Sequence, residues 1–369
     1  MNNNSPILLI GVGGSGCAIA HGVNRAFGES MRHVLCDTDA VSARENSRFI
    51  LLGGDRLSGH GSGGDVAQAR LAAEDSKHAF DDLLEGVRLA VLVTSLGGGT
   101  GSGATIEILK YLKQVGIPGI VFATLPFTFE GEERQRRARG ITTIIEEEAG
   151  GAIFTPLDNL ISGEDNMNEA MRRAVDTLAS GVTLFWRLLQ KPGYIRLDTE
   201  RIRKIISIAG RGRFATITTQ GDDRANEAIK ALKNSPLLTN NQGPTRSILA
   251  GILAGDDLRL SEVGFLANNI RETFGEQASF DIATVNDEET FSGRLSLVVM
   301  LFEANKQSQL NDDSVSSSPN GKRRGKREHN PLALGPKGRG RFTNVEPTIY
   351  NGEDLDVPTF SRRNIILDI

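Results

Sequence analysis

The sequence predicts an α/β protein, in which a doubly wound parallel sheet is joined by a long central helix to a second, α+β domain. Three observations lead to this fold class. Short apolar runs alternate with helical stretches up to about residue 154, which is typical of a parallel sheet with helices on both faces. A long helical pattern then spans Met167 to Gln190. The segments after it alternate apolar and polar residues, as strands with one exposed face do.

The first domain is assigned to residues 1–165. Its predicted strands are short and apolar, and they are residues 6–10, 33–36, 89–95, 117–125 and 151–154. The helical stretches between them are residues 14–27, 66–84, 102–115 and 132–148. Ligands of such sheets bind at the carboxyl ends of the strands. We therefore expect the site in the loops that follow these strands.

The central helix is assigned to residues 166–192, because Lys191-Pro192-Gly193 is a firm helix stop. The second domain is assigned to residues 193–304. Its predicted helices are residues 199–208, 222–233 and 259–275, and its predicted strands are residues 213–218, 247–253, 279–285 and 293–302. This order predicts a half-exposed sheet that contacts the first domain through the central helix.

Residues 305–345 are predicted to be a disordered basic linker. The clusters Lys322–Arg327 and Lys337–Arg341 have almost no acidic residue between them. Such a segment buries too little apolar surface to offset the entropy of ordering it. Residues 346–369 regain apolar side chains, and a short mixed peptide after a linker is typical of a docking motif.

Composition limits the classes of function. A chain of 369 residues is long enough for two domains, and its net charge of −4 does not suit a general polyanion binder. The two cysteines, Cys17 and Cys36, fit a reducing compartment. No stretch reaches the length of a membrane span, and the five histidines lack metal-ligand spacing. We therefore expect a cytoplasmic protein.

Two glycine-rich loops carry most of the functional information. Gly97–Gly103 and Gly11–Gly16 each follow a predicted strand and precede a helical stretch. Glycine lets the backbone approach an anion closely, and the start of the next helix offers unpaired N–H groups. The hydroxyls of Thr100 and Ser102 can donate to phosphate oxygens or reach the shell of a Mg²⁺ ion. Together the two loops indicate a nucleotide held from both sides.

The first loop alone permits another interpretation. It has the GxGxxG pattern of dinucleotide-binding domains, and Asp37 and Asp39 lie close to the expected position of a ribose-binding acid. An NAD(P)-dependent oxidoreductase is therefore an alternative. Since a dinucleotide-binding domain needs one diphosphate loop, the second loop favours a different kind of nucleotide site.

The motifs together resemble the tubulin/FtsZ family, on its bacterial FtsZ-like side. The stretches with family counterparts are Gly11–Gly16, Asp37–Ala40, Gly61–Asp65, Gly97–Gly103, Leu125–Arg134, Gly221–Ala225, Ser235–Leu238 and, in the tail, Asp354–Phe360. The similarity covers roughly residues 5–303, and several ordered motifs make coincidence improbable. The resemblance implies GTP or GDP with Mg²⁺ as the ligand, and copies of the chain itself as the main partner.

The resemblance also implies a set of nucleotide-binding residues, which are Gly13, Gly14, Ser15, Asp39, Gly61, Ser62, Gly63, Gly64, Gly97, Gly98, Gly99, Thr100, Gly101, Ser102, Glu130, Arg134, Met171 and Asp176. Glu130 and Arg134 correspond to sugar and phosphate contacts. Asp176 aligns with the residue that reads guanine, whose Watson–Crick edge offers two N–H groups to a carboxylate. Met171 replaces an aromatic residue that stacks on the base.

Two further positions refine this expectation. Leu157 stands where the family has a polar ribose contact, so we expect somewhat weaker nucleotide binding. No direct protein ligand for the metal is predicted, and the Mg²⁺ shell is expected near Asp39 and Thr100.

The chain departs from the family in the loop after the central helix, which one subunit inserts into the nucleotide site of the next. Asp198 keeps an acidic position, but Arg196 replaces an asparagine and Arg201 replaces the catalytic aspartate. A guanidinium cannot take a proton from water, although it can pair with a phosphate of the neighbouring subunit. Asp198 and Glu200 remain as catalytic candidates. Glu200 is one residue from the required position, which is about 100° of helix rotation.

We therefore expect a GTP-binding protein that polymerises head-to-tail into filaments, with slow or absent GTP hydrolysis. It would act as a membrane-associated cytoskeletal scaffold in division or membrane remodelling, peripheral at the inner face of the plasma membrane. A non-polymerising GTPase switch and an NAD(P)-dependent oxidoreductase are the alternatives. The tail is expected to bind a membrane adaptor or anionic lipid. The alternative for the basic clusters at residues 322–341 is that they are only a solvating linker. Nucleic acid ranks last, because the basic clusters lack interleaved aromatic residues.

Overall fold

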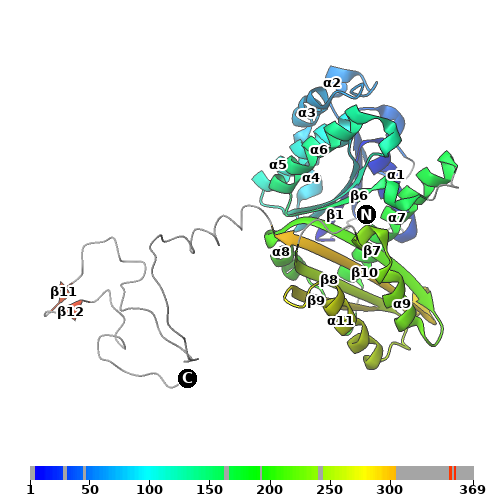
Figure 1. Cartoon of the computed structure of the whole chain (residues 1–369). Helices are drawn as coiled ribbons and strands as arrows, with labels where there is room; N and C mark the ends of the chain where they lie inside the picture. Colours follow the sequence, from blue (N-terminus) through cyan, green and yellow to red (C-terminus); the bar gives the residue numbers. More distant parts are fainter. Residues whose placement is uncertain are drawn as a thin grey trace, which may run out of the picture. The chain divides into compact units, whose positions relative to one another are not determined.

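The computed structural model describes most of the chain up to Ala304 and four residues of the tail. The described residues are 5–27, 31–44, 47–161, 166–191, 193–239, 244–304, 349–350 and 353–354. The chain divides into two units, residues 1–316 and 317–369, and nearly all described elements belong to the first (Figure 1). The linker expected at residues 305–345 lies outside the described residues.

A ten-stranded sheet with the order β3-β2-β1-β4-β5-β6-β7-β10-β8-β9 is the frame of the first unit. The strands are β1 Ile7–Val12, β2 His33–Asp37, β3 Phe49–Leu51, β4 Leu89–Ser95, β5 Gly119–Leu125, β6 Gly151–Pro156, β7 Ala209–Gln220, β8 Thr245–Ala254, β9 Ser279–Asn286 and β10 Arg294–Ala304. The strands from β3 to β7 pair in parallel, and β10 runs antiparallel to both β7 and β8. Every predicted strand is present, and β3 was not predicted.

Helices cover the sheet and connect its strands. They are α1 Gly13–Phe27, α2 Gly54–Leu57, α3 Val66–Asp75, α4 Asp81–Leu84, α5 Gly99–Gln114, α6 Glu132–Glu148, α7 Met167–Gln190, α8 Thr199–Ile208, α9 Arg224–Lys233, α10 Pro236–Thr239, α11 Leu260–Phe274 and α12 Glu288–Phe291, with the 3₁₀ turns η1 Ala40–Ser42, η2 Lys77–Phe80, η3 Thr128–Glu130 and η4 Leu157–Leu160.

The helix predicted at residues 66–84 is wrong as one element, because α3 ends at Asp75. Ser76 leaves the helical conformation with φ −103° and ψ 5°, and its side-chain oxygen accepts a hydrogen bond from the N–H of Gly53 at 2.8 Å. Serine competes with helical backbone in this way. The chain then continues as η2 and α4, which buries Phe80.

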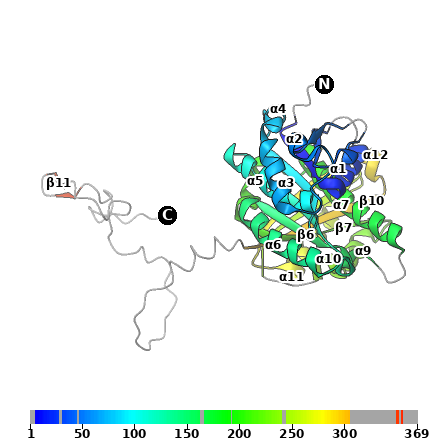
Figure 2. The ribbon, with the colours of Figure 1, turned by 90° about the horizontal axis from the view of Figure 1, so that it is seen from above.

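Alternate residues of the first strands pack on opposite faces of the sheet. In β1, Ile7 and Leu9 belong to one buried cluster, whereas Leu8 and Ile10 belong to another. The first cluster includes residues of α1 and α7, and the second includes residues of α3, α5 and α6. Figure 2 shows these helices from above. Strands buried on both faces explain the continuous apolar runs, and the doubly wound parallel arrangement is confirmed.

The long helix α7 ties the two halves of the sheet together. The ring of Phe122 in β5 lies with its centroid 5.9 Å from that of Phe185 in α7 and 5.8 Å from that of Phe214 in β7. All three side chains are buried. Edge-on and tilted aromatic contacts of this kind add to the stabilisation from burial. One apolar core therefore runs from the first half of the sheet through α7 into the second.

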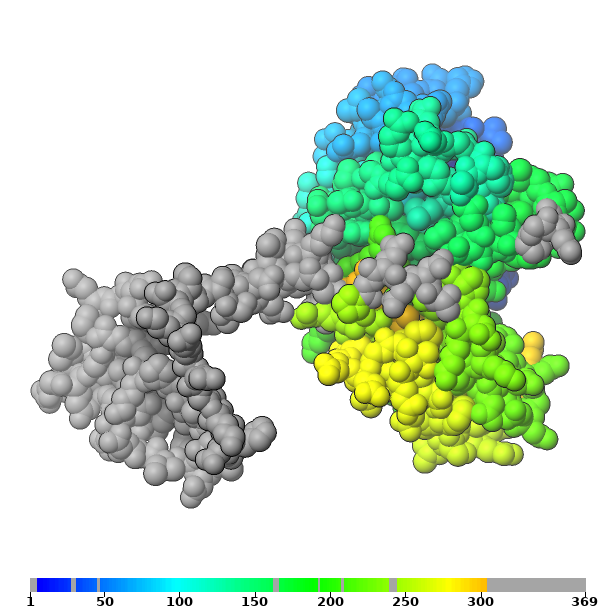
Figure 3. Space-filling view, in the orientation of Figure 1, coloured from blue at the N-terminus to red at the C-terminus, as the bar shows by residue number. Residues whose placement is uncertain are grey.

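The sheet itself is continuous between the two predicted domains. β6 pairs with β7 through Ala152 with Arg211 and Ile153 with Gly212. In the space-filling view, the surface of the first half, blue to green, meets that of the second half, green to yellow (Figure 3). The domain boundaries 1–165, 166–192 and 193–304 therefore stay a prediction.

The second unit contributes a small described element. Strands β11 Ile349–Tyr350 and β12 Glu353–Asp354 pair antiparallel. The rest of the docking peptide expected at residues 346–369 lies outside the described residues. Within the described chain, no helix is both long enough and apolar enough to span a membrane.

Candidate functional site

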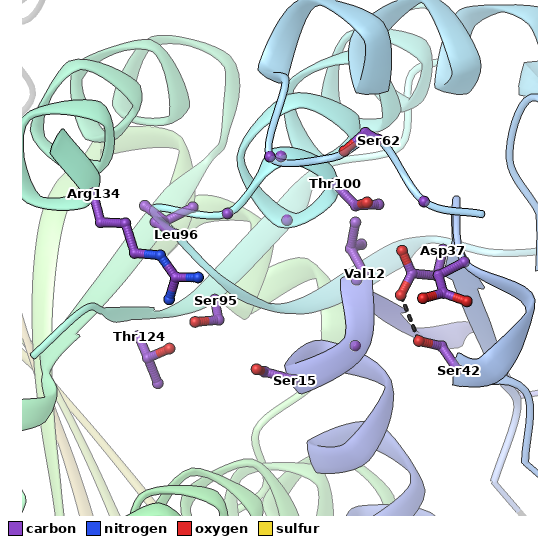
Figure 4. A pocket seen from close by; sticks show the side chains of 18 of the residues that line it. Val12, Ser15, Asp37, Ser42, Ser62, Ser95, Leu96, Thr100, Thr124 and Arg134 are labelled. Atoms are coloured by element: carbon purple, nitrogen blue, oxygen red, sulfur yellow. Dashed lines mark hydrogen bonds between the residues drawn. The ribbon is translucent and has the colours of Figure 1, made fainter. Parts of the chain in front are cut away.

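A cavity of about 420 Å³ opens where β1, β2, β4 and β5 end (Figure 4). The predicted residues that line it are Gly13, Gly14, Ser15, Asp39, Gly61, Ser62, Gly63, Gly64, Gly98, Gly99, Thr100, Gly101, Glu130, Arg134 and Met171. Parallel strands bring their carboxyl ends to one edge of the sheet, which is why loops from four strands meet here. Three predicted residues, Gly97, Ser102 and Asp176, do not line this cavity.

The glycine loops are in direct contact with one another. Gly13 has a φ of +75°, and a Cβ there would lie 3.0 Å from the backbone N of Gly101. A Cβ on Gly99 would lie 2.2 Å from the Oγ of Ser62 and 2.9 Å from the backbone carbon of Gly64. The contact at Gly99 is too close for a side chain, and the contact at Gly13 is tight in a backbone conformation that favours glycine. Glycine therefore lets the three loops close around one space.

Two helices begin at this cavity. α1 starts at Gly13, directly after β1, and α5 starts after the N-cap residue Gly98, which makes no side-chain capping hydrogen bond. The first N–H groups of a helix have no partner within it, and they carry the positive end of the helix dipole. The cavity therefore presents two sets of backbone donors suited to phosphate oxygens.

Two aspartates lie on the β2 side of the cavity. The carboxylate of Asp37 is 4% exposed, and it accepts hydrogen bonds from Thr38 N at 2.7 Å and from Ser42 Oγ at 2.5 Å (Figure 4). Asp39 accepts from Val41 N at 2.9 Å, which caps the turn η1. These bonds hold both carboxylates in place beside the glycine loops.

The two hydroxyls of the second glycine loop have different roles. Thr100 lines the cavity, and its Oγ1 lies 2.7 Å from Oγ1 of the buried Thr38. Ser102 is fully buried, and its Oγ accepts a hydrogen bond from Gly97 N at 3.0 Å. The prediction that Ser102 faces a phosphate is therefore corrected. The hydrogen bond from Gly97 N to Ser102 Oγ closes the turn after β4, so Ser102 stabilises that turn from its buried side.

Gly97 is placed by the same turn. It has a φ of +96°, and its carbonyl oxygen accepts a hydrogen bond from Arg137 Nη1 of α6 at 2.9 Å. The carbonyl is thus directed at α6, and Gly97 supports the loop without lining the cavity.

Glu130 and Arg134 form an ion pair at the cavity wall. Glu130 also accepts a hydrogen bond from Phe127 N at 2.9 Å, which fixes the turn η3. Arg134 points toward the hollow in Figure 4. Of the described residues that line the cavity, it is the sole basic one.

The α7 side of the cavity is apolar. Met171, Ala174 and Val175 line it together with Leu157. Asp176 is exposed and instead lines two hollows beside it. The reason is helical geometry, since one residue turns the side chain by about 100° relative to Val175. The position expected for the guanine-reading group is thus next to the cavity and not in its wall.

Asp158, which stands beside Leu157, serves the fold. Its carboxylate accepts from Thr128 Oγ1 at 2.6 Å and from Thr128 N at 3.1 Å. These bonds tie the turn η3 to the turn η4 and leave Leu157 facing the cavity.

Several lining residues were not predicted as binding residues. They are Val12, Ile19, Asp37, Ser42, Ser95, Leu96, Thr124, Ala174 and Val175. Four of them lie at or near the carboxyl ends of β1, β2, β4 and β5, so the predicted strand ends were a usable signal. The residues on α1 and α7 offered no such signal, because their contribution depends on how the helices pack.

Both cysteines lie beneath the first glycine loop. The thiols of Cys17 and Cys36 donate to the carbonyl oxygen of Gly11 at 3.6 and 3.3 Å. Burial, assisted by the nearby carboxylate of Asp37, raises the pKa of the Cys17 thiol to about 12. The thiols therefore stay protonated near neutral pH and act as buried donors.

No group of three or more histidine, cysteine, aspartate or glutamate side chains suited to a metal ion occurs in the described part of the chain. Mg²⁺ commonly binds to one or two protein oxygens together with oxygens of its phosphate ligand and water. Asp39 and Thr100 line the cavity with oxygens of this kind.

Where the loop before α8 ends, the charged side chains of Asp198, Glu200 and Arg201 all have partners within the chain. Asp198 is the N-cap of α8, and its Oδ1 accepts from Arg201 N at 2.7 Å. The guanidinium of Arg201 pairs with Asp281 of β9, with Nε and Oδ1 2.5 Å apart. Glu200 is exposed and pairs with Arg203 at 3.2 Å. Arg201 is thus already paired with a carboxylate of its own chain while its side chain is 55% exposed, and its pairing with a neighbour's phosphate stays a prediction.

This loop is anchored to β9. Ile195 N donates to Thr284 Oγ1 at 3.0 Å, and Thr284 N donates to the carbonyl oxygen of Ile195 at 2.8 Å. A Cβ on Gly193 would lie 1.7 Å from the Thr284 carbonyl oxygen, so glycine is required at this contact. On this anchored base, Tyr194 is 75% exposed.

The chain was compared with known families and proteins. Residues 6–163 match the model of the Tubulin/FtsZ family, GTPase domain, and residues 210–302 match that of the FtsZ family, C-terminal domain. The cell division protein FtsZ of Pseudomonas aeruginosa is 32% identical over 290 residues, which cover 77% of this chain and 73% of that protein. FtsZ of Buchnera aphidicola is 30% identical over 293 residues, covering 78% of this chain and 76% of that protein.

Solved structures share the fold at lower identity. An empty FtsZ dimer from M. jannaschii has a TM-score of 0.74 and 22% identity, covering 80% of this chain and 88% of that one. A GTPγS-bound protofilament of CetZ2 from Haloferax volcanii has a TM-score of 0.68 and 22% identity, covering 84% and 99%. The tubulin/FtsZ fold class is thereby confirmed.

The contact between the glycine loops predicts the effect of a serine at Gly99. Its Cβ would meet Ser62 and the backbone of Gly64, so one loop must move. We expect Gly99→Ser to lower the free energy of unfolding by about 1–3 kcal/mol, the usual cost of overpacking. The measurement is the thermal unfolding midpoint of the ligand-free protein.

The neighbouring glycine offers a matched control. A Cβ on Gly98 has nothing within 4 Å, and serine is favoured at the N-cap position that Gly98 occupies. Gly98→Ser should keep the midpoint of the parent protein. Equal midpoints for the two variants would contradict the proposed packing of the loops.

Proposed function

Because this chain belongs to the tubulin/FtsZ family, we propose that its cavity binds GTP and GDP and that its copies assemble head-to-tail into filaments. One observation carries the proposal. Three glycine loops, residues 11–16, 61–65 and 97–103, close on one cavity at the carboxyl edge of the sheet. Family membership leaves the NAD(P)-dependent oxidoreductase without support.

Phosphate groups would be held mainly by backbone donors. The starts of α1 and α5 supply N–H groups, and the close glycine contacts let a polyphosphate approach them. Asp37, Asp39 and Glu130 give the cavity wall more negative than positive charge, which suits a polyphosphate carrying Mg²⁺. When bound, GTP would supply the β–γ phosphoanhydride bond, whose hydrolysis gives GDP and phosphate. Thr100 and Asp39 lie on the side where we expect the Mg²⁺ shell.

Base recognition would come from α7. Met171, Ala174 and Val175 form an apolar wall that a purine ring can pack against. Asp176 lies beside this wall and lines the neighbouring hollows. From there its carboxylate would accept from guanine's N–H groups, which favours guanine over adenine.

Filament assembly is supported by exposed apolar side chains at two places in the fold. Tyr194 and Ile195 stand on the anchored loop before α8 and are 75% and 39% exposed. Val41 and Phe129 flank cavity-lining residues and are 82% and 59% exposed. If the loop of one copy covers the cavity of the next, both sets become buried in one contact. Such a heterologous contact repeats into an open filament.

A charged residue at Tyr194 should block this assembly. We expect the protein to sediment with GTP or a non-hydrolysable analogue and not without nucleotide. Tyr194→Asp should raise the critical concentration about thirtyfold, as losing about 2 kcal/mol per contact does. Val115→Asp, at an exposed apolar residue after α5, is the matched control and should sediment normally. Equal sedimentation of both variants would refute the proposed contact, and nucleotide binding without sedimentation would favour the non-polymerising switch.

Slow hydrolysis is part of the proposal. In the loop before α8, Arg196 and Arg201 stand where the family resemblance places an asparagine and a catalytic aspartate. Asp198 is committed to capping α8, and Glu200 pairs with Arg203. No carboxylate at position 201 is available to orient water for attack, which removes a general-base contribution of roughly 10²–10⁴-fold.

Restoring the family's residues should raise turnover, provided that the local charge is balanced. Arg201→Asp alone would set two carboxylates against each other, because Asp281 is nearly buried beside it. We expect Arg196→Asn with Arg201→Asp and Asp281→Asn to increase steady-state phosphate release at least about tenfold. Arg196→Asn with Asp281→Asn is the control and should stay slow. Fast phosphate release by the parent protein would refute slow hydrolysis.

Membrane attachment through the tail is the final part of the proposal, and it would make the filament a peripheral scaffold for division or membrane remodelling on the cytoplasmic side. Each basic residue near an anionic surface contributes about 1 kcal/mol. We expect the full chain to float with vesicles rich in phosphatidylglycerol and not with phosphatidylcholine vesicles. Glutamine at the basic residues of 322–327 and 337–341 should abolish flotation. Flotation that persists in this variant would assign the attachment to another segment.

A further inference from the structure

A second, larger cavity of about 640 Å³ lies between the two halves of the first unit. Residues of α1 and α7 line one side of it, and residues of β7, α12 and β10 line the other. Figures 1 and 2 both place α1, α7, β7 and β10 close together. The proposed nucleotide site does not use this cavity, which we name the arginine cleft.

The arginine cleft is basic, in contrast to the first cavity. Arg25, Arg187 and Arg294 line it, with Asp176 as the one carboxylate among its described lining residues. The cleft is also lined by residues with hydroxyl groups, which are Ser180, Thr183, Thr218, Thr290 and Ser296. Arginine and hydroxyl donors together recognise phosphate or carboxylate oxygens.

Arg187 is held rigidly at the base of the cleft. Its side chain is 13% exposed, and Nη1 donates to Asp287 at 2.8 Å and to Thr290 Oγ1 at 3.2 Å. The guanidinium carbon lies 5.6 Å from the ring centroids of both Phe27 and Phe291. Within the described chain, its hydrogen bonds all involve Nη1. Nε and Nη2 of this fixed group therefore remain as donors for a ligand.

Arg25 and Arg294 stand at the exposed edges of the cleft. Arg294 donates to the carbonyl oxygen of Thr290 at 2.5 Å, which directs it along the α12 side. Arg25, near the end of α1, has no hydrogen-bond acceptor among the described residues. Two incompletely neutralised cations thus face one space from opposite halves of the sheet. Like charges destabilise each other, and an anion between them removes that cost.

We propose that the arginine cleft is a second binding site, for a small ligand with several phosphate groups. A multiply charged phosphate ester or polyphosphate matches the guanidinium groups of Arg25 and Arg294, with Nε and Nη2 of the paired Arg187 as further donors. Charge-assisted hydrogen bonds make such contacts strong. The cleft has walls on two sides, so it suits a compact anion that enters it.

The same helices connect this cleft to the first cavity. α1 begins at Gly13 in the first cavity and carries Gly22 and Arg25 into the arginine cleft. On α7, Val175 lines both cavities. A ligand that draws α1 and α7 toward β10 therefore changes the affinity of the first cavity, and the coupling is reciprocal. This coupling rests on the proposed function, whereas binding in the cleft does not.

Inorganic tripolyphosphate is the probe for the test. The full chain is saturated with GDP, so that the first cavity is filled, and titrated by calorimetry at constant ionic strength. We expect one tripolyphosphate per chain. Arg25→Gln with Arg294→Gln should weaken binding roughly tenfold or more, which is about 1.4 kcal/mol or more, because charge-assisted hydrogen bonds are lost. Both arginines are exposed, so the variant should fold and keep the thermal midpoint of the parent.

A control with the same change of charge separates the cleft from general electrostatics. Arg136 and Arg139 are exposed on α6 and line neither cavity. Arg136→Gln with Arg139→Gln should bind tripolyphosphate as the parent does. Absence of binding by the parent, or equal weakening in both double variants, would overturn the proposal.

The coupling has its own readout. Saturating tripolyphosphate should change the Kd for GDP roughly fivefold more in the parent than in the Arg25→Gln, Arg294→Gln variant, at the lower end of allosteric couplings. If the Kd for GDP changes equally in both proteins, tripolyphosphate merely competes with GDP at the first cavity, and the coupling is refuted. If the parent binds no GDP, the proposed function fails, and the same titration of nucleotide-free protein still tests the cleft through the two double variants.

Discussion

The approach of three glycine loops to within side-chain contact is the constraint on which the site depends. Gly13 lies tightly against Gly101 with a positive φ, and Gly99 lies against Ser62 and Gly64 at distances that leave no room for a Cβ. Because these loops follow separate strands, their contact brings the starts of α1 and α5 to one place. The backbone donors, the aspartates after β2 and the Glu130–Arg134 pair all take their positions around that contact. A single added methyl group would act on the whole arrangement.

Helix α7 extends this arrangement into the second half of the sheet. Phe185 of this helix packs with Phe122 and Phe214 in one core. Other residues of α7 line two cavities, one with more acidic and one with more basic side chains. On its phosphate side, the first cavity is lined by glycine loops and carboxylates, which suits a phosphate chain that carries a metal ion. The second is lined by arginines and hydroxyls, which suits an anion alone. One rigid helix thus provides a wall to both, and this is the physical basis for expecting the two to influence each other.

In the loop before α8, the positive charge of Arg201 is compensated by a carboxylate elsewhere in the same fold. Arg201 stands where the family resemblance places an acid, yet it pairs with Asp281 across 80 residues of sequence. The pairing makes an exposed arginine part of the contact between α8 and β9. It also means that a single reversal at position 201 would leave Asp281 facing a like charge. Because Asp281 compensates the charge of Arg201, the loop can carry an arginine in place of an acid and still keep its anchored shape. Tyr194 remains exposed to solvent on this loop.

Local patterns were sufficient to identify the strands, the central helix and the glycine loops. Buried parallel strands need nearly continuous apolar runs, and a helix needs a stop such as that after Gln190. Close approach of a phosphate needs glycine. Each of these features therefore has a recognisable pattern within a short stretch of sequence. Local patterns could not predict four features of the structure. These are the inward direction of Ser102, the position of Asp176 beside the cavity, the Arg201–Asp281 pair and the arginine cleft. Each depends on the relative placement of residues distant in sequence, which is set by the packing of helices on the sheet. Side-chain direction and charge pairing follow from that packing, because a rotation of one helical residue moves a group from a cavity wall to its neighbour.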